Sequence, residues 1–212
     1  LVRTTQGEFR IGAIAKGAGM IDPNMATMLC AITTDAVVAQ PVFRKLPRTA
    51  VETSFNRITI DGDMSTNDTV IALANGASGV TPPEDDLLEA LHAVTQTLAR
   101  QIVLDGEGVT KFVEIEIQGA RSAKDARAAA EAVANSTLVK CALAGGDPNW
   151  GRIMDALGYS GARIQENKIS ITYDGLPIVS GGLATTTSWK KLKAIAARKE
   201  FNIIIDLAMG AA

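Results

Sequence analysis

Thr27 is the residue of this chain whose surroundings best suit covalent chemistry. It follows a segment that is broken by Gly17, Gly19 and Pro23, and it precedes an apolar run from Met28 to Ile32. Glycine permits backbone angles that other residues resist, and proline fixes its own φ. The spacing therefore predicts that Thr27 lies where a loop of unusual backbone geometry meets a buried strand.

A threonine hydroxyl in such a place can attack the peptide carbonyl that precedes it, which here belongs to Ala26. The resulting ester would hydrolyse and leave Thr27 as a new N-terminus. Its free α-amine could then act as general base for its own hydroxyl. The residue types alone leave a second interpretation open, because a threonine that opens a buried strand is usually only a strand residue.

The elements that must position Thr27 follow from hydrophobic periodicity, which predicts a mixed α/β protein. A clean helix start at Thr81-Pro82-Pro83-Glu84, with Thr81 as N-cap of a capping box, precedes apolar residues at helical spacing up to Ile102. An Ala-rich helix capped by Ser122 is expected next, and Asp174-Gly175 indicates a hairpin turn. Strands are expected over 8–15, 28–32, 58–60, 111–118, 169–173, 177–179 and 201–207, with further helices from 41 and around 189–195.

Composition excludes several classes of function. The chain of 212 residues is 47% hydrophobic and 21% charged, with a formal net charge of −2. This balance gives no reason to expect nucleic acid or an anionic membrane as a partner, and no apolar run is long enough to span a bilayer. Cys30 and Cys141 are both expected to be buried free thiols, which fits a reducing compartment such as the cytoplasm.

The polar loop from Asp61 to Thr69 invites a metal-site hypothesis, because Asp61, Asp63 and Ser65 alternate. A calcium loop would also need a glycine after the third acidic position and a distal glutamate at fixed spacing. Neither is present, so a polar turn is expected and no metal. His92 is the only histidine and is expected on a helix surface, so a Ser-His-Asp triad would depend wholly on it.

Two glycine-rich segments remain without a firm role from residue types alone. Glu107 stands between glycines at the expected end of a helix, where it either belongs to a turn or points into a cleft. The residue pattern by itself favours the turn. The segment from Gly145 to Arg152 lacks the Lys-Ser/Thr of a phosphate-binding P-loop, so a helix start at Asp147 or Pro148 is the simpler account.

Several motifs resemble one known family. The run from Ala15 to Leu29, with Thr33-Thr34-Asp35-Ala36 after it, resembles the self-cleavage region of ornithine acetyltransferases, the glutamate N-acetyltransferase family of the cyclic arginine pathway. Further matches follow in family order over most of the chain. They are Phe55-Asn56, Asp61-Gly62-Asp63-Met64-Ser65-Thr66-Asn67-Asp68-Thr69, Ala74-Asn75-Gly76, Asp105-Gly106-Glu107-Gly108, Asn135-Ser136, Val139-Lys140 and Gly146-Asp147-Pro148-Asn149-Trp150-Gly151-Arg152-Ile153.

The resemblance implies acetyl transfer from N2-acetylornithine to glutamate through an acetyl-threonine intermediate, after self-cleavage between Ala26 and Thr27. Thr27 would be the nucleophile and its freed amine the base, while Lys16 and Glu107 match substrate-contacting positions and so favour the cleft for Glu107. A lysine and a glutamate suit a substrate that carries both an α-carboxylate and a terminal ammonium. No cofactor is implied, although acetyl-CoA is a possible co-substrate.

The family also implies an architecture and partners. The expected fold is the four-layer α/β/β/α arrangement of self-processing N-terminal-nucleophile proteins, followed by a smaller α/β domain. Residues 1–26 would be the tail of the N-terminal (alpha) chain, 27–121 the nucleophile-bearing domain and 122–212 the smaller domain. Family members are about twice as long, so the chain is expected to be a fragment that lacks the family's oxyanion-hole Thr-Gly pair and its C-terminal substrate-binding residues. Its partner would be the alpha part, in a heterotetramer of two alpha and two beta chains, in the cytoplasm or, in a eukaryote, the mitochondrial matrix.

Two other functions stay open at this point. A self-processing aminopeptidase or amidase of the same architecture would pass the acyl group to water instead of an amine. A non-catalytic fragment would serve as a binding or assembly domain and would leave the bond before Thr27 uncut.

Overall fold

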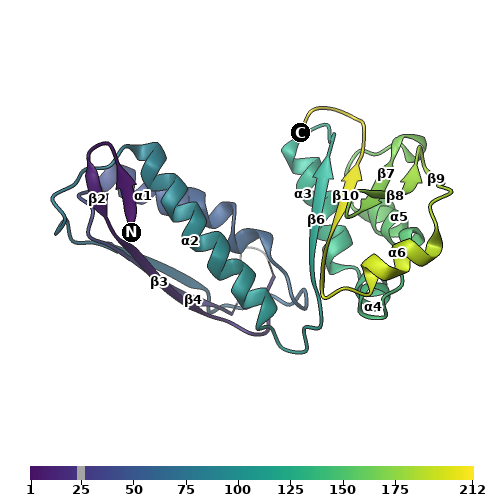
Figure 1. Cartoon of the computed structure of the whole chain (residues 1–212), viewed down its shortest axis with the longest axis horizontal. Helices are drawn as coiled ribbons and strands as arrows, with labels where there is room; N and C mark the ends of the chain where they lie inside the picture. The colour runs from purple at the N-terminus through teal and green to yellow at the C-terminus, as the bar shows by residue number, and fades with distance from the viewer. Residues whose placement is uncertain (23–26) are drawn as a thin grey trace. The chain divides into compact units, whose positions relative to one another are not determined.

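The computed structural model describes residues 1–22 and 27–212 and has the mixed α/β structure that the sequence predicts (Figure 1). The chain forms two compact units, Leu1–Val109 and Thr110–Ala212. Ala26 lies outside the described residues, so the predicted cleavage position is described only on its Thr27 side. Among the described helices, even the longest lacks the combined length and apolarity that crossing a membrane requires.

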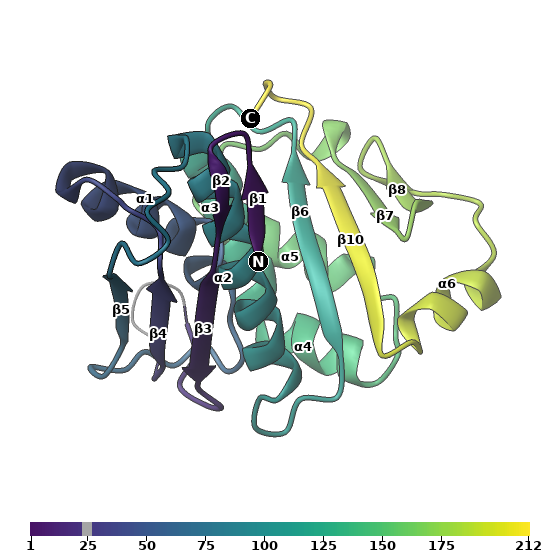
Figure 2. The same cartoon turned by 60° about the vertical axis from the view of Figure 1, so that its left-hand side comes forward.

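The first unit is built on a three-stranded sheet. The strands β3 (Ile11–Lys16), β4 (Leu29–Thr34) and β5 (Thr69–Ala74) lie side by side in that order (Figure 2). β3 runs antiparallel to β4, and β4 runs parallel to β5. A hairpin of β1 (Val2–Thr4) and β2 (Gly7–Phe9) precedes them. Side chains alternate along β4, so that Cys30 and Ile32 are buried while Leu29 and Ala31 are exposed on the other face.

Two helices, α1 (Gln40–Glu52) and α2 (Glu84–Leu104), cover the buried face of this sheet, and the short η1 (Phe55–Arg57) follows α1. The expected apolar stripe of α2 is confirmed, since Leu87, Leu91 and Ile102 are buried and α2 packs against β3. Burying such a stripe is what stabilises an amphipathic helix in a domain. The C-terminal end of α2 therefore lies near the end of β3.

Two local predictions in this unit are wrong. The capping box at Thr81 does not form, because α2 begins at Glu84 and its N-cap residue is Pro83, with no side-chain cap. Acidic residues in the first turn complement the helix dipole there instead. Residues 58–60 form no strand either. They form a loop, in which the Ile60 N–H donates to the Ile21 carbonyl at 2.9 Å. The next strand, β5, starts later, at Thr69.

The second unit contains a five-stranded sheet in the order β6-β10-β7-β8-β9. β6 and β10 are parallel, and the other neighbours are antiparallel. The predicted turn at Asp174-Gly175 joins β7 to β8, and the Ser122 hydroxyl caps α3 by accepting from the Asp125 N–H. The elements are β6 (Phe112–Gln118), α3 (Ala123–Asn135), α4 (Thr137–Ala144), α5 (Trp150–Tyr159), η2 (Glu166–Lys168), β7 (Ser170–Tyr173), β8 (Leu176–Ser180), β9 (Leu183–Ala184), α6 (Trp189–Ala196) and β10 (Glu200–Asp206).

The division between the units comes earlier than the boundary expected near residue 121. It falls between Val109 and Thr110, because β6 pairs with β10 along its whole length and so belongs to the second unit. The expectation that Cys141 is buried is wrong. α4 turns Val139, Ala142 and Leu143 into the core, which leaves Cys141 exposed, while Cys30 is buried as expected.

Candidate functional site

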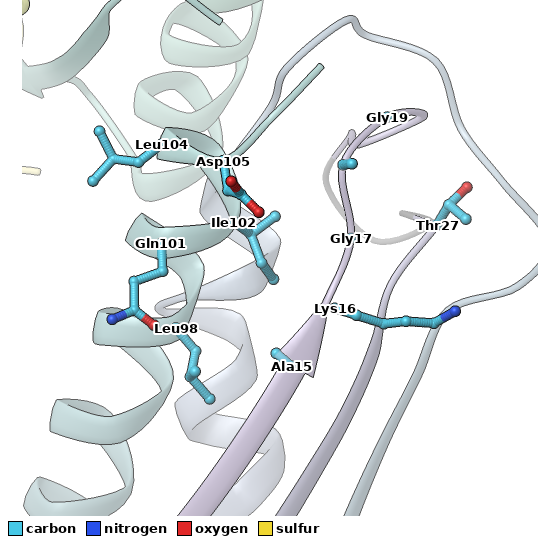
Figure 3. Close-up of a pocket in the computed structure, with 11 residues that line it drawn as sticks. Ala15, Lys16, Gly17, Gly19, Thr27, Leu98, Gln101, Ile102, Leu104 and Asp105 are labelled. Atoms are coloured by element: carbon cyan, nitrogen blue, oxygen red, sulfur yellow. The ribbon is translucent and has the colours of Figure 1, made fainter.

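An open pocket of about 800 Å³ lies in the first unit, where the end of β3 meets the last turns of α2 (Figure 3). Lys16 and Thr27 both line it, so the structure brings together two of the residues that the sequence singled out. The remaining lining residues come from the glycine-rich segment and from α2, namely Ala15, Gly17, Ala18, Gly19, Leu98, Gln101, Ile102, Leu104 and Asp105.

Thr27 occupies the junction that the sequence predicts, one residue before Met28 and two before β4 begins at Leu29. Its backbone N–H donates to the Met20 carbonyl at 2.7 Å. Its Oγ1 is buried and has no hydrogen-bond partner within residues 1–22 and 27–212. A buried hydroxyl without a partner costs roughly 1–3 kcal/mol, which is a reason to look for a chemical role for it.

Lys16 is the last residue of β3 and lies on the exposed face of the sheet, opposite Leu29 in the strand register. Figure 3 shows its side chain extending from β3 across β4, on the side where Thr27 stands. A smaller pocket of about 140 Å³ is lined by Lys16, Thr27, Met28, Leu29 and Asn67. Lys16 therefore lines both pockets together with the candidate nucleophile.

Glu107 is held against the glycine-rich segment from the other side. Its N–H donates to the Ala18 carbonyl at 2.7 Å, and a Cβ added to Gly19 would lie 3.1 Å from its Oε2. The helix before it ends at Leu104, as predicted. Glu107 thus belongs to an exposed turn and lies against Gly19, which lines the pocket, but Glu107 is not itself among the lining residues.

Asp61 fixes the conformation of the glycine-rich segment. Its Oδ2 accepts the Met20 N–H at 2.7 Å, and its Oδ1 accepts the N–H groups of Ile21 and Asp63 at 3.1 Å each. Burial raises the pKa of Asp61, but the N–H groups of Asp63, Met20 and Ile21 outweigh it, and the pKa lies below the usual range of an aspartate. Met20 itself has a φ of 52°, a conformation that costs a non-glycine residue on the order of 1 kcal/mol or more.

Gly17 offers a test of how tightly this segment packs against Thr27. A Cβ at Gly17 would meet the Thr27 carbonyl oxygen at 3.1 Å and the Met28 Cβ at 3.3 Å. Gly17→Ala is expected to lower the free energy of unfolding by about 1–3 kcal/mol, because backbone atoms cannot move aside as a flexible side chain would. Denaturant unfolding measures this loss. Gly12→Ala, on β3, is the control, since the nearest neighbour of the added Cβ, the Thr33 Oγ1, would be at 3.5 Å. Equal losses in both variants would contradict the expectation.

Several residues of the pocket were not found by sequence reasoning. Gln101 lies on the last turn of α2, and Asp105 is the C-cap residue of that helix. The spacing of four residues places both on one side of a helix and could have indicated them from the sequence. Asn67 lies in the polar loop that the sequence assigned only to a turn. No group of three or more histidine, cysteine or acidic side chains in the described ranges is arranged to hold a metal ion.

Two other residues or segments that the sequence discussed lie apart from these pockets. His92 sits on α2, partly buried rather than on the surface, and its Nε2 has no partner among the described residues. The segment from Gly145 to Arg152 belongs to the second unit, where Asn149 caps α5 by accepting the Arg152 N–H. The helix therefore starts at Trp150, two residues beyond Pro148, and capping accounts for the polar residue before it.

Comparison with known proteins identifies the family of this chain. A protein-family model described as "ArgJ family" matches residues 1–212 of this chain. The "Glutamate N-acetyltransferase" of Methanocaldococcus jannaschii is 46% identical over 95% of this chain and 53% of its own length. The "Arginine biosynthesis bifunctional protein ArgJ" of Geobacter sulfurreducens is 48% identical, with the same coverage of each chain. This chain therefore spans about half the length of the curated relatives it matches.

A crystal structure of the arginine biosynthesis bifunctional protein ArgJ from Bacillus halodurans has the same fold. Its TM-score is 0.82 at 33% sequence identity, and the match covers 86% of this chain and 89% of that one. Fold and sequence thus lead to the same family over nearly the whole length of the chain. The chain, in which Thr27 lines the pocket at the end of β3, belongs to the ArgJ family.

Proposed function

We propose that this chain is part of an N-acyltransferase that cuts itself before Thr27 and then moves an acetyl group from N2-acetylornithine to glutamate. The observation that carries the proposal concerns Thr27, whose buried hydroxyl has no hydrogen-bond partner among the residues that the structure describes, while its backbone N–H donates to the Met20 carbonyl. Membership in the ArgJ family supports the same chemistry.

In the self-cleavage step, the Thr27 Oγ attacks the carbonyl carbon of Ala26. The bond between that carbon and the Thr27 nitrogen breaks, and the hydroxyl proton passes to the nitrogen, which becomes an amine. Water then hydrolyses the ester, giving a carboxylate at Ala26 and restoring the Thr27 hydroxyl. The product is an N-terminal threonine whose amine lies next to its own nucleophile.

In the transfer cycle, the amine accepts the proton of the Thr27 hydroxyl as the oxygen attacks the acetyl carbonyl of N2-acetylornithine. Ornithine leaves with its α-amine protonated, and an acetyl ester remains on Thr27. The α-amine of glutamate then attacks this ester and restores the hydroxyl. Such a double displacement predicts ping-pong kinetics.

Lys16 and Glu107 are proposed to bind the two charged ends of the donor. The Lys16 ammonium would pair with the α-carboxylate, which ornithine and glutamate share. The Glu107 carboxylate would pair with the terminal ammonium, which only ornithine has. Charge-assisted hydrogen bonds of this kind are the strong ones, so the two side chains supply orientation as well as affinity.

The exposed face of the β3-β4-β5 sheet supports the proposal that an N-terminal part of the same precursor is the partner. Ile14, Ala31 and Ile71 are neighbours across this face in the strand register, and Ile14 is 73% exposed. Leu73 is 60% exposed beside them. Packing a second sheet here would complete four layers and would bring oxyanion-hole donors to Thr27. We propose two copies of each part in the assembly, located in the cytoplasm, or in the mitochondrial matrix of a eukaryote.

A charge on this face is expected to weaken that association. Ile71→Glu would have to bury a carboxylate among apolar side chains, which proteins avoid unless the charge is paired. Co-purification of the two parts of the precursor should fall at least tenfold. Leu183→Glu is the matched control, because Leu183 is equally apolar and 74% exposed, on β9 of the other unit. Undiminished co-purification of Ile71→Glu would rule out this face as the docking surface.

The function is tested on the intact precursor by supplying N2-acetylornithine together with isotope-labelled glutamate. The proposal expects labelled N-acetylglutamate and ornithine to form in equal amounts. Ornithine and free acetate without N-acetylglutamate would identify the aminopeptidase or amidase alternative instead. Neither product, together with an uncut chain, would identify a non-catalytic protein. Replacing the donor by acetyl-CoA in a parallel reaction decides whether that molecule is a co-substrate.

A further inference from the structure

Asp61 holds the glycine-rich segment from a distant part of the chain. Its carboxylate accepts the Met20 N–H at 2.7 Å and the Ile21 N–H at 3.1 Å, which lie 41 and 40 residues before it. The next backbone contact reinforces this link, because the Ile60 N–H donates to the Ile21 carbonyl at 2.9 Å. Ile21 is fully buried, so the anchored segment is fixed to the core at this point.

Met20 connects Asp61 to Thr27, whose bond to Ala26 is the one proposed to be cut. Its N–H is bound to Asp61, and its carbonyl accepts the Thr27 N–H at 2.7 Å. The Thr27 nitrogen is the leaving atom of the proposed cleavage and afterwards the proposed general base. Met20 adopts a φ of 52°, which L residues rarely take, so its peptide groups need outside contacts to stay as they are.

The same segment also sets the position of Glu107. The Ala18 carbonyl accepts the Glu107 N–H at 2.7 Å, and Gly19 lies directly against the Glu107 carboxylate. A Cβ on Gly19 would also be 3.7 Å from the Asp61 Oδ2. The carboxylates of Asp61 and Glu107 therefore flank one glycine, the first bound to backbone N–H groups and the second proposed to face the substrate.

We propose that Asp61 is a positioning residue of this site, which through Met20 fixes the Thr27 nitrogen and so sets the rate of self-cleavage. The inference rests on the proposed function for the cleavage reaction, but the anchoring itself does not. The N–H groups of Met20, Ile21 and Asp63 keep the pKa of Asp61 low, although its burial acts in the other direction, so the carboxylate remains a double acceptor at neutral pH.

Asparagine at position 61 has the same shape but only one acceptor oxygen. Its NH₂ group would face a backbone N–H, and two donors cannot form a hydrogen bond with each other. At least one of the Met20, Ile21 and Asp63 N–H groups then loses its partner. Nucleophilic attack depends steeply on the placement of the reacting atoms, so a loosened Met20 carbonyl should slow the chemistry even where the fold is intact. Asp61→Glu keeps both acceptor oxygens and should recover part of the rate.

The experiment uses the intact precursor in two forms. In the cleavable form, the rate of cutting is followed by intact mass for the wild type, Asp61→Asn, Asp61→Glu and Asp68→Asn. The last variant is the matched control, because it removes one exposed carboxylate from the same polar loop. In a Thr27→Ala background, which keeps the chain whole, hydrogen exchange is measured over residues 17–22 with aspartate or asparagine at position 61.

The expected result is cleavage at least tenfold slower in Asp61→Asn, with Asp61→Glu in between and Asp68→Asn at the wild-type rate. Exchange over 17–22 should be at least tenfold faster in Asp61→Asn, while exchange in α2 stays unchanged. Wild-type cleavage by Asp61→Asn, unchanged exchange over 17–22, or equally slow cleavage in the asparagine and glutamate variants would each overturn the inference. A wild-type precursor that is never cut would instead overturn the proposed function, and the exchange comparison would still decide whether Asp61 anchors the segment.

Discussion

Replacing Thr27 by alanine is expected to leave the precursor whole and to abolish acetyl transfer. The variant removes the only atom proposed to form the ester with Ala26 and later with the acetyl group. Removing a nucleophile typically costs three or more orders of magnitude in rate, as triad variants show, so no cut product should accumulate over hours. Intact mass under denaturing conditions measures this, because the wild type should give two species that separate between residues 26 and 27.

Two further variants make this result specific. Thr33→Ala removes a threonine hydroxyl from β4, the strand that follows Thr27, where the hydroxyl donates to the Gly12 carbonyl at 3.3 Å, and this variant should be cut like the wild type. Thr27→Ser keeps a hydroxyl on the Cβ and should still be cut. A Thr27→Ala precursor that separates at the same place would show that Thr27 is not the nucleophile of the cleavage.

Glu107→Gln is expected to lower kcat/KM for N2-acetylornithine by about 10- to 100-fold. The change keeps the size of the side chain but removes the charge proposed to pair with the terminal ammonium. A hydrogen bond to a charged group contributes roughly 1.5–3 kcal/mol, which corresponds to a rate change of that order. The measurement is the steady-state rate with N2-acetylornithine and with its neutral analogue N-acetylnorvaline, which has the same carbon chain without the ammonium.

The role of Glu107 is tested best by comparing kcat/KM and KM across several variants and substrates. Glu107→Gln should narrow the preference for N2-acetylornithine over N-acetylnorvaline and leave the KM for glutamate nearly unchanged. Lys16→Met should weaken both half-reactions, because both substrates carry an α-carboxylate. Glu114→Gln, at an exposed carboxylate on β6, should behave as the wild type. An unchanged donor preference in Glu107→Gln would assign Glu107 to the turn alone.

The sequence determined the features that depend on neighbours along the chain. The apolar stripe of α2, the Ser122 cap of α3 and the turn at Asp174-Gly175 each need only a spacing or a residue type, and all three form as predicted. The junction at Thr27 was predictable for the same reason, since glycine and proline restrict the backbone before an apolar run. The assignment of Thr27, Lys16 and Glu107 to one reaction came from family motifs and not from periodicity.

The sequence was less reliable where a local signal competed with packing. Thr81 has the pattern of a capping box, yet α2 starts at Glu84. Cys141 has apolar neighbours, yet the helix period turns it outward. The two compact units divide after Val109, before the boundary expected near residue 121, and the pairing of β6 with a strand more than eighty residues further along cannot be inferred from either segment alone.

Tertiary structure alone decided how the site is assembled. Asp61 meets Met20 across 41 residues, and Glu107 meets Ala18 and Gly19 across nearly ninety. These contacts depend on the parallel pairing of β4 with β5 and on where the end of α2 packs against β3. Hydrophobic periodicity reports which face of an element is buried, but not which other element buries it, because burial of apolar surface is non-directional. The polar contacts that hold Thr27 in place could therefore be recognised only after the core had fixed which loops meet.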